Sequence, residues 1–264
     1  MAPTPSSPEI TIVTGASRGI GLAIAHAFAA LGHRLLLVAR DGDRLGTAAR
    51  AVAAAGAAAG AAIETFAVDL RDDAAPAAAV AAATRCFGAP TVVVDNAGTA
   101  PSDKIERTTP AMLHDTFALH VGAPLGFARA CVPAMKAAGR GCLLHLASTA
   151  GLRGYPFTAA YTAAKHGMVG LARALHAELR PARIDVYALC PGFVDSDITR
   201  GAAAAIAARG GLTADEAFAR MAAQNRIGRM HTPAEVAAAA VRLVRERPVG
   251  CVFELDRDPP AFVD

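Results

Sequence analysis

Tryptophan is absent from this chain of 264 residues, aromatic residues make up only 5% of it, and only three of its 26 basic residues are lysines. Basic and acidic residues are interspersed and leave a net charge of +3, which is too small and too scattered to favour nucleic acid or an anionic membrane as a partner. The histidines show no spacing typical of a metal site, so no bound metal is expected. The lysines, Lys104, Lys136 and Lys165, stand out in a chain that otherwise uses arginine.

Long apolar runs and paired cysteines are also missing. The longest apolar run, residues 51–63, is 13 residues of mainly Ala and Gly, short of the ~20 needed to span a bilayer. The five cysteines (Cys86, Cys131, Cys142, Cys190 and Cys251) form no CxxC and exclude a disulfide scaffold; they are interpreted as small buried side chains in a reducing compartment. The first residues lack the basic and apolar regions of a secretory signal, so a cytoplasmic protein is expected.

Short apolar runs alternate with alanine-rich stretches of helical spacing along most of the chain. Strands are predicted at residues 10–14, 34–39, 63–68, 91–95, 142–147, 184–189 and 249–255, and helices near 19–31, 43–55, 73–87, 110–138, 159–180 and 233–246. Near-continuous apolar strands are typical of a parallel sheet buried on both faces. The sequence therefore predicts an α/β fold, with a single domain over residues 1–264 and a doubly wound, seven-stranded parallel sheet flanked by helices.

The interval of residues 195–230 interrupts this alternation. It has a helical composition and contains Thr213 followed three residues later by Glu216, the spacing of a helix capping box. Because the insertion follows a late strand, it lies where α/β proteins place their ligands. We interpret it as a small, mobile helical substrate lid, with an ordinary surface helix pair as the alternative.

A glycine-rich segment, TGASRGIG, follows the first predicted strand and opens the first helix. Its glycines are Gly15, Gly19 and Gly21. Such a turn lets the backbone approach a pyrophosphate, whose charge is favoured by the free N–H groups and the dipole of the helix N-terminus. The motif predicts a dinucleotide site, and a tight strand-to-helix turn without a ligand is the alternative.

A second motif joins Tyr161 and Lys165 at a spacing of four residues. With three tyrosines and three lysines in the chain, such a pair is expected by chance roughly 0.03 times. On a helix this spacing puts both side chains on one face, where an ammonium group lowers the pKa of a phenol toward the working pH of a general acid or base. Ser148 ends an apolar run 13 residues earlier, where its hydroxyl can hold a carbonyl oxygen.

Together these motifs resemble the short-chain dehydrogenase/reductase family. TGASRGIG, Asp69-Leu70, Asn96-Ala97-Gly98, Ser148, YTAAK and Pro191-Gly192 occur in the family's order and spacing, from about Glu9 to about Val244. The resemblance implies a Rossmann-type fold. It also implies that Tyr161 exchanges the substrate proton, that Lys165 binds the nicotinamide ribose and tunes Tyr161, and that Ser148 orients the substrate oxygen.

The resemblance also implies a set of cofactor contacts. These residues are Gly15, Ser17, Arg18, Gly19, Ile20, Gly21, Arg40, Asp69, Leu70, Asn96, Ala97, Gly98, Tyr161, Lys165, Pro191, Gly192, Val194 and Ser196. Asp69 and Leu70 would bracket the adenine, Asn96 and Gly98 would line the cofactor path, and Val194 and Ser196 match positions that contact the carboxamide.

Two positions depart from the family pattern. His120 stands where the family usually has an asparagine that holds a water in a proton relay through the lysine. It is interpreted either as a relay residue, which would titrate in the pH–rate profile near neutrality, or as a packing substitution. The C-terminus reads VFELDRDPPAFVD where relatives often have a Gly-Gly pair, which puts the family's C-terminal contacts in doubt.

The charge pattern after the second strand favours NADP(H) over NAD(H). NAD-preferring relatives place an acidic residue there for the ribose 2′-OH, whereas this chain has Ala39 followed by Arg40, and Arg18 lies in the glycine-rich segment. Guanidinium groups suit a 2′-phosphate. Asp41 keeps NAD(H) open as the alternative.

The leading hypothesis is an NADP(H)-dependent oxidoreductase that acts on a 3-oxoacyl thioester, because the resemblance is strongest to 3-oxoacyl-thioester reductases and 3-hydroxyacyl-CoA dehydrogenases. A ketoreductase for a polyketide, cyclic or steroid-like ketone is the near alternative, and a non-catalytic cofactor-binding regulator is the alternative of another class. A homotetramer or homodimer is expected from the resemblance, supported by small residues at Ala163, Ala164, Gly167, Gly170, Ala172 and Ala174.

Overall fold

The computed structural model describes residues 8–264, and its centre is one eight-stranded sheet in the order β3-β2-β1-β4-β5-β6-β7-β8. The strands are β1 (Ile10–Thr14), β2 (Arg34–Ala39), β3 (Ala62–Ala67), β4 (Val92–Asp95), β5 (Gly141–Leu146), β6 (Ile184–Cys190), β7 (Val252–Glu254) and β8 (Ala261–Phe262). The first seven are parallel, as predicted, but β8 pairs antiparallel to β7. The prediction of seven strands missed β8, because a strand of two residues is too short to show a pattern of apolar and polar residues.

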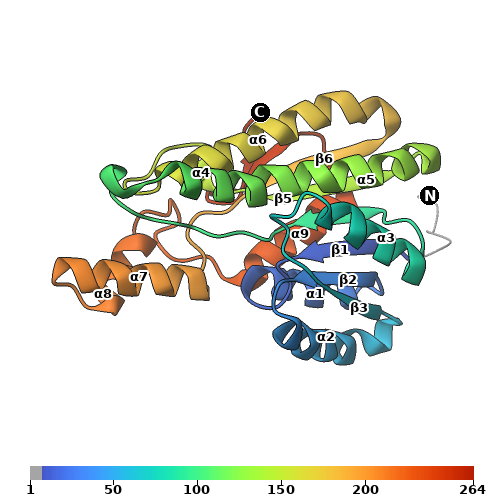
Figure 1. Cartoon of the computed structure of the whole chain (residues 1–264), viewed down its shortest axis with the longest axis horizontal. Coiled ribbons are helices and arrows are strands. Elements are labelled where there is room, and N and C mark those ends of the chain that lie inside the picture. Colours follow the sequence, from blue (N-terminus) through green and yellow to red (C-terminus); the bar gives the residue numbers. More distant parts are fainter. Residues whose placement is uncertain (1–7) are drawn as a thin grey trace.

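Helices cover both faces of the sheet (Figure 1). One face packs against α1 (Gly19–Ala29), α2 (Gly42–Gly56) and α9 (Pro233–Glu246), and the other against α3 (Ala75–Phe87), α5 (Ala123–Ala138) and α6 (Ala159–Leu179). The strands β2, β4 and β5 are buried almost throughout, which is why they read as near-continuous apolar runs, whereas the edge strand β3 is partly exposed.

The order of the strands reverses next to β1. The chain runs outward from β1 through β2 to β3, and then returns to place β4 on the other side of β1. In open α/β sheets such a switch point leaves a crevice at the carboxyl ends of the strands, where ligands bind. The glycine-rich segment follows β1 and Asn96 follows β4, so both predicted motifs lie at this crevice.

The long helix predicted at residues 110–138 is interrupted. It consists of α4 (Pro110–Phe117), a π-helical turn (Ala118–Gly122) and α5. Pro124 has no N–H to donate to the carbonyl of His120, so the regular ladder breaks at this point. The break places His120 in the π-helical turn, where its side chain is buried.

The insertion of residues 195–230 forms two helices, α7 (Asp197–Gly210) and α8 (Ala214–Ala222), which protrude at one end of the molecule (Figure 1). The predicted capping box is present, since Thr213 accepts from the Glu216 backbone and Glu216 bonds back to Thr213. A small core of its own holds the pair together: Ala203, Ala217, Met221 and Met230. The mobility of this lid stays a prediction.

The cysteines are free thiols, and the prediction that all are buried was wrong for Cys86, which is exposed on α3. The other four are buried, and burial raises their pKa values to about 12. Within residues 8–264 no helix combines the length and apolar character needed to cross a membrane. The sequence argument against a secretory signal rests mainly on residues 1–7, which lie outside the described residues.

Candidate active site

A cleft of about 1300 Å³ opens at the carboxyl ends of the strands, beneath the lid. Its lining includes the three predicted catalytic residues, Ser148, Tyr161 and Lys165, and the predicted cofactor residues Gly15, Ser17, Arg18, Gly19, Ile20, Arg40, Asp69, Leu70, Asn96, Ala97, Gly98, Pro191, Gly192, Val194 and Ser196. Residues as far apart in the sequence as Gly15 and Ser196 therefore meet in one place.

The glycine-rich turn is held from below by β4. Gly15 and Gly19 have φ angles of 65° and 56°, which favour glycine. The Asn96 side chain donates to the carbonyls of Thr14 (2.9 Å) and Gly15 (3.3 Å), while the Thr14 hydroxyl accepts from the backbone of Asn96 and Ala97. Asn96 thus fixes the loop with its amide, and Thr14, which the sequence did not indicate, does the same with its hydroxyl.

Gly21, assigned to cofactor binding from the sequence, does not line the cleft. A Cβ atom there would lie 2.3 Å from the carbonyl oxygen of Gly15 and 2.4 Å from the amide nitrogen of Asn96. The absence of a side chain lets α1 begin against the strand, which positions the loop without a direct contact.

Replacing Gly21 by alanine is therefore expected to reduce the free energy of unfolding by about 2 kcal/mol, the scale of overpacking in a closed site. Gly46 is the matched control, because a Cβ on it meets only Arg50 at 3.7 Å. Gly46→Ala in the exposed helix α2 should be neutral or slightly stabilising. Urea denaturation of both variants measures the difference, and equal stabilities would contradict this packing argument.

The predicted catalytic side chains meet at the floor of the cleft. Ser148 follows β5, while Tyr161 and Lys165 lie one turn apart on α6. The Lys165 ammonium donates to the Leu146 carbonyl (2.5 Å) and lies 5.7 Å from the centre of the Tyr161 ring. Lys165 is 4% exposed, and burial lowers its pKa to about 7.

The direction of the Tyr161 pKa differs from the sequence expectation. Burial raises the pKa of Tyr161 to about 12, and a hydrogen bond with Ser148 only partly opposes this. The expected lowering of the pKa rested on the neighbouring ammonium and did not include the cost of desolvating a phenolate. At neutral pH Tyr161 is a protonated phenol and can act as an acid.

His120 packs edge-on against the Tyr161 ring, with ring centroids 5.7 Å apart. Its Nε2 lies 2.8 Å from the Thr99 carbonyl, an acceptor, and 3.3 Å from the Thr99 backbone N–H, a donor; the shorter contact favours the tautomer with the proton on Nε2. Its Nδ1 is a buried acceptor without a hydrogen-bond partner among the described residues. Gly98 makes room for the ring, since a Cβ there would lie 2.5 Å from Cε1 of His120.

Burial and the neighbouring Lys165 lower the pKa of His120 to about 3. The expectation that a relay through His120 would titrate near neutrality was therefore wrong. The ring is neutral over the usual assay range, and it can serve only as a fixed donor to Thr99 and a free acceptor at Nδ1.

We expect His120→Asn to leave the shape of the pH–rate profile between pH 6 and 9 unchanged, because no charge on residue 120 changes there. His120→Leu removes the Nδ1 acceptor while keeping an apolar side chain of similar bulk. If Nδ1 orders a proton path, His120→Leu should turn over about tenfold more slowly than His120→Asn. Profiles of both variants at saturating cofactor test this, and loss of a limb near pH 6.5 in His120→Asn would contradict the neutral ring.

The far end of the cleft offers positive charge. The Arg40 side chain forms no hydrogen bond or ion pair within residues 8–264, whereas the Asp41 carboxylate accepts from the Arg44 backbone (3.0 Å) and caps α2. Arg18 pairs with Asp197 of α7 (2.9 Å), which joins the glycine-rich segment to the lid. Arg40 is thus available to a ligand, while Asp41 already has a structural role.

Three more of the predicted cofactor residues also have structural roles. Asp69 forms a bidentate pair with Arg71, which lowers its pKa to about 2. The Ser196 hydroxyl caps α7 by accepting from Thr199 (3.4 Å). Gly192 must lack a side chain, because a Cβ would lie 2.3 Å from the side-chain oxygen of Asn225.

The walls of the cleft are mainly apolar, and the sequence analysis missed most of them. Tyr155 and Phe193 pack edge-on with ring centroids 5.7 Å apart. Phe157, 60% exposed, and Ile198 and Ile206, each 43% exposed, also line the cleft. The sequence gives little indication that these residues line a cleft, because aromatic residues in loops and isoleucines in helices are found in many environments.

A family model for short chain dehydrogenases matches residues 9–207. The chain therefore belongs to the short-chain dehydrogenase family, and it is an NAD(P)-dependent oxidoreductase that acts on CH–OH groups.

Among its relatives is a Streptomyces virginiae protein named as a ketoacyl reductase of the monensin polyketide synthase, 34% identical over 236 residues that cover 89% of each chain. The 2-(S)-hydroxypropyl-CoM dehydrogenase 3 of Xanthobacter autotrophicus is 32% identical, with 94% of this chain and 95% of the relative covered. Among solved structures, a variant of actinorhodin polyketide ketoreductase with NADPH has a TM-score of 0.83, 31% identity and 90% coverage of both chains. The L-sorbose reductase of Gluconobacter frateurii with NADPH and L-sorbose has a TM-score of 0.86 and 28% identity, with 94% and 95% covered.

Proposed function

We propose that this protein is an NADP(H)-dependent ketoreductase that reduces the 3-keto group of an acyl thioester with an apolar acyl chain. The observation that carries the proposal is the set of Ser148, Tyr161 and Lys165 on the floor of a cleft whose walls are apolar. The polyketide ketoacyl reductase among its relatives supports the same class of substrate.

The residues present fit a nicotinamide dinucleotide. A Cβ at Gly19 would meet no atom within 4 Å, so open space faces the backbone where α1 begins. Free N–H groups at that helix N-terminus would hold the pyrophosphate, and Arg40 would hold a 2′-phosphate. When bound, the nicotinamide supplies the hydride that reduces the carbonyl carbon.

The chain's own residues provide the proton and the orientation. The Ser148 hydroxyl would donate a hydrogen bond to the ketone oxygen. The Tyr161 phenol, protonated at neutral pH, would give its proton to the same oxygen as negative charge develops there. Lys165, fixed by Leu146, would lie beside Tyr161 and stabilise its anion afterwards. A protonated Tyr161 favours reduction over oxidation near neutral pH.

Replacing Arg40 by alanine is expected to lower the affinity for NADPH about tenfold or more and to change the affinity for NADH by less than about twofold. The reason is that only NADPH carries the 2′-phosphate. The matched control is Arg50→Ala, which removes the same charge from the exposed face of α2, away from the cleft. Dissociation constants from cofactor fluorescence measure both. Adding Arg18→Ala should lower the affinity for NADPH further. Equal losses of affinity for both cofactors would mean that these arginines do not bind the 2′-phosphate.

Oxidation of NADPH with acetoacetyl-CoA and with a panel of small ketones tests the substrate class. The proposal expects a higher kcat/KM for the thioester and an increase as the acyl chain lengthens along Phe157, Ile198 and Ile206. A preference for polar ketoses would contradict it.

The second candidate is a ketoreductase for a cyclic polyketide-like ketone. It is favoured by the aromatic pair Tyr155 and Phe193, which can stack on a planar ring. A cyclic ketone such as trans-1-decalone in the same panel separates the two, because it lacks the thioester and extended chain.

We also propose a homotetramer or homodimer in the cytoplasm. The small residues of α6 support oligomerisation less than expected. Ala164 and Ala172 are buried within the chain itself, and Gly167 faces Phe117 and Val121 of the same chain. Gly170, with open space around it, is the position where a second copy can approach closely.

A further inference from the structure

A second cavity, of about 430 Å³, is lined by arginines that the proposed reaction does not use. Arg153, Arg173, Arg226 and Arg257, here called the arginine pocket, line it together with Gly151, Leu152, His166, Glu254 and Val263. Among the described residues none lines both this pocket and the catalytic cleft. The arginines come from a loop after β5, from α6, from the loop after α8 and from the turn after β7.

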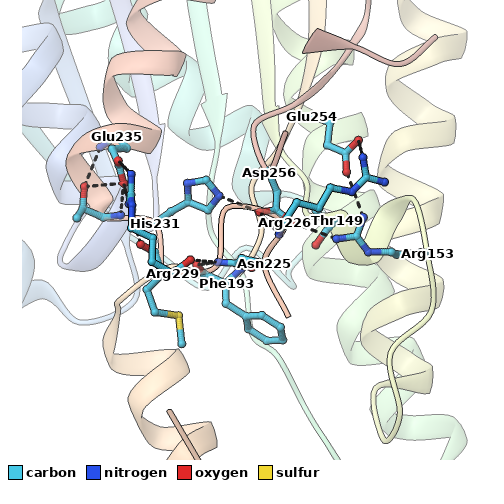
Figure 2. A network of polar contacts seen from close by, with 12 residues as sticks. Thr149, Arg153, Phe193, Asn225, Arg226, Arg229, His231, Glu235, Glu254 and Asp256 are labelled. Atoms are coloured by element: carbon cyan, nitrogen blue, oxygen red, sulfur yellow. Dashed lines mark hydrogen bonds and ion pairs between the residues drawn. The ribbon is translucent and has the colours of Figure 1, made fainter. Parts of the chain in front are cut away.

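Arg153 forms the fixed side of the pocket. It donates to Glu254 (3.1 Å), to Asp256 (3.1 Å) and to the hydroxyl of Tyr155 (3.0 Å). Figure 2 shows Arg153 beside the two carboxylates. Both acids are buried, with exposed fractions of 3% and 0%. Asp256 also accepts from the Arg226 backbone and lies 3.4 Å from His231, so its oxygens are fully used.

The other three guanidinium groups form no hydrogen bond within the described residues, although two of them form long ion pairs with Glu254. Arg226 and Arg257 lie 3.7 Å and 3.6 Å from Glu254, which is too far for a hydrogen bond. Arg173 has neither a hydrogen bond nor an ion pair within the described part of the chain. Each guanidinium carries five N–H donors in a planar fork, so the pocket offers many donors and few acceptors.

The charge of the pocket also favours an anionic ligand. Four arginines face two carboxylates, Glu254 and Asp256, which leaves about two positive charges around a partly enclosed space. The nearby Asp264 carboxylate keeps its negative charge, but it does not line the pocket and is held by the backbone of Cys251 and Val252. Positive charge held in a concave surface attracts anions.

We propose that the arginine pocket binds a small phosphate-bearing anion, held by Arg173, Arg226 and Arg257 over the Glu254 ion pairs. A phosphate dianion matches the excess charge, and its oxygens match the guanidinium forks in a bidentate manner. The site is separate from the cofactor cleft, where Arg40 is proposed to read a 2′-phosphate.

Titration calorimetry with inorganic phosphate tests the site. The full chain is saturated with NADPH so that the cofactor cleft is filled, and sodium chloride keeps the ionic strength constant. The wild type should bind one phosphate per chain at millimolar concentration. The double variant Arg173→Ala/Arg257→Ala, which loses two of the three guanidiniums proposed to hold the anion, should bind about tenfold more weakly or worse. Arg50→Ala/Arg242→Ala is the matched control, because it removes the same charge from exposed helix faces and should bind like the wild type.

Two outcomes would overturn the proposal: no phosphate binding by the wild type, and equal affinity in the double variant. If the second comes with an altered sedimentation mass, the arginines belong to an interface between copies. The Arg40→Ala variant separates this site from the proposed function. It should lose NADPH affinity while keeping phosphate binding, so failure of either proposal appears in a different measurement.

Discussion

Replacing Tyr161 by phenylalanine is expected to lower the rate of NADPH-dependent ketone reduction by ~10² or more while leaving NADPH affinity nearly unchanged. The substitution removes the phenol that lies beside Ser148 and Lys165 at the floor of the cleft, and loss of a general acid has this scale. The phenyl ring keeps its edge contact with His120. Stopped-flow turnover and cofactor titration of the same preparation measure the two quantities.

The matched control is Tyr187→Phe. Tyr187 is buried in the core between the sheet and the helices α1, α2 and α9, on the face opposite to α6. Its hydroxyl donates to the Pro248 carbonyl (2.9 Å), outside the catalytic cleft. Its loss should reduce stability by about 1 kcal/mol without affecting the chemical step. Near-wild-type turnover in Tyr161→Phe would contradict the role of Tyr161 as the acid, whereas absence of turnover in the wild type would favour the alternative of a non-catalytic cofactor-binding regulator.

The wild-type pH profiles follow from the raised pKa of Tyr161. Reduction needs the phenol, which remains protonated up to about pH 12, so its rate should not fall for lack of the acid between pH 6 and 9. Oxidation of the alcohol needs the phenolate, whose fraction grows tenfold with each pH unit below that pKa, so this rate should rise over the same range. The rise should be less than tenfold per unit above about pH 7, where Lys165 loses the charge that stabilises the phenolate.

Replacing Lys165 by methionine is expected to abolish most of the activity and to stabilise the fold. The activity loss should again be ~10² or more, because the ammonium that stabilises the Tyr161 anion is removed. The stability gain has an electrostatic origin, since burial lowers the pKa of Lys165 from 10.5 to about 7. After allowing for the Leu146 carbonyl left without its donor, the gain below pH 7 is on the order of 2 kcal/mol.

The pH dependence of this gain has a defined sign. Between pH 7 and 10.5 the unfolded chain binds a proton on Lys165 that the folded chain has released, so wild-type stability rises with pH over this window. The difference in melting temperature between Lys165→Met and the wild type should therefore be largest at pH 6 and shrink toward pH 10. Lys136→Met, on the exposed side of α5, is the control and should show no such trend. A lower melting temperature of Lys165→Met at pH 6 would contradict a destabilising buried charge.

The sequence determined the parts of this protein that depend on short-range spacing. Tyr161 and Lys165 share a helix face because four residues make about one turn. The TGASRGIG segment lies at the crevice because it joins a buried strand to a helix at the point where the strand order reverses. Arg40 follows β2 directly, so its place at the end of the cleft was predictable. Most of the seven parallel strands were also predictable, since burial on both faces leaves continuous apolar runs such as those of β2 and β4.

Only the tertiary structure decided the features that depend on neighbours in space. The pKa shifts of Tyr161, Lys165 and His120 are all dominated by burial, and desolvation cannot be inferred from a local motif. The interruption at His120 and the role of Gly21 follow from close packing against segments far away in the sequence. The arginine pocket gathers side chains from residues 153 to 257, and their surplus charge arises because the fold brings four guanidinium groups and only two carboxylates together.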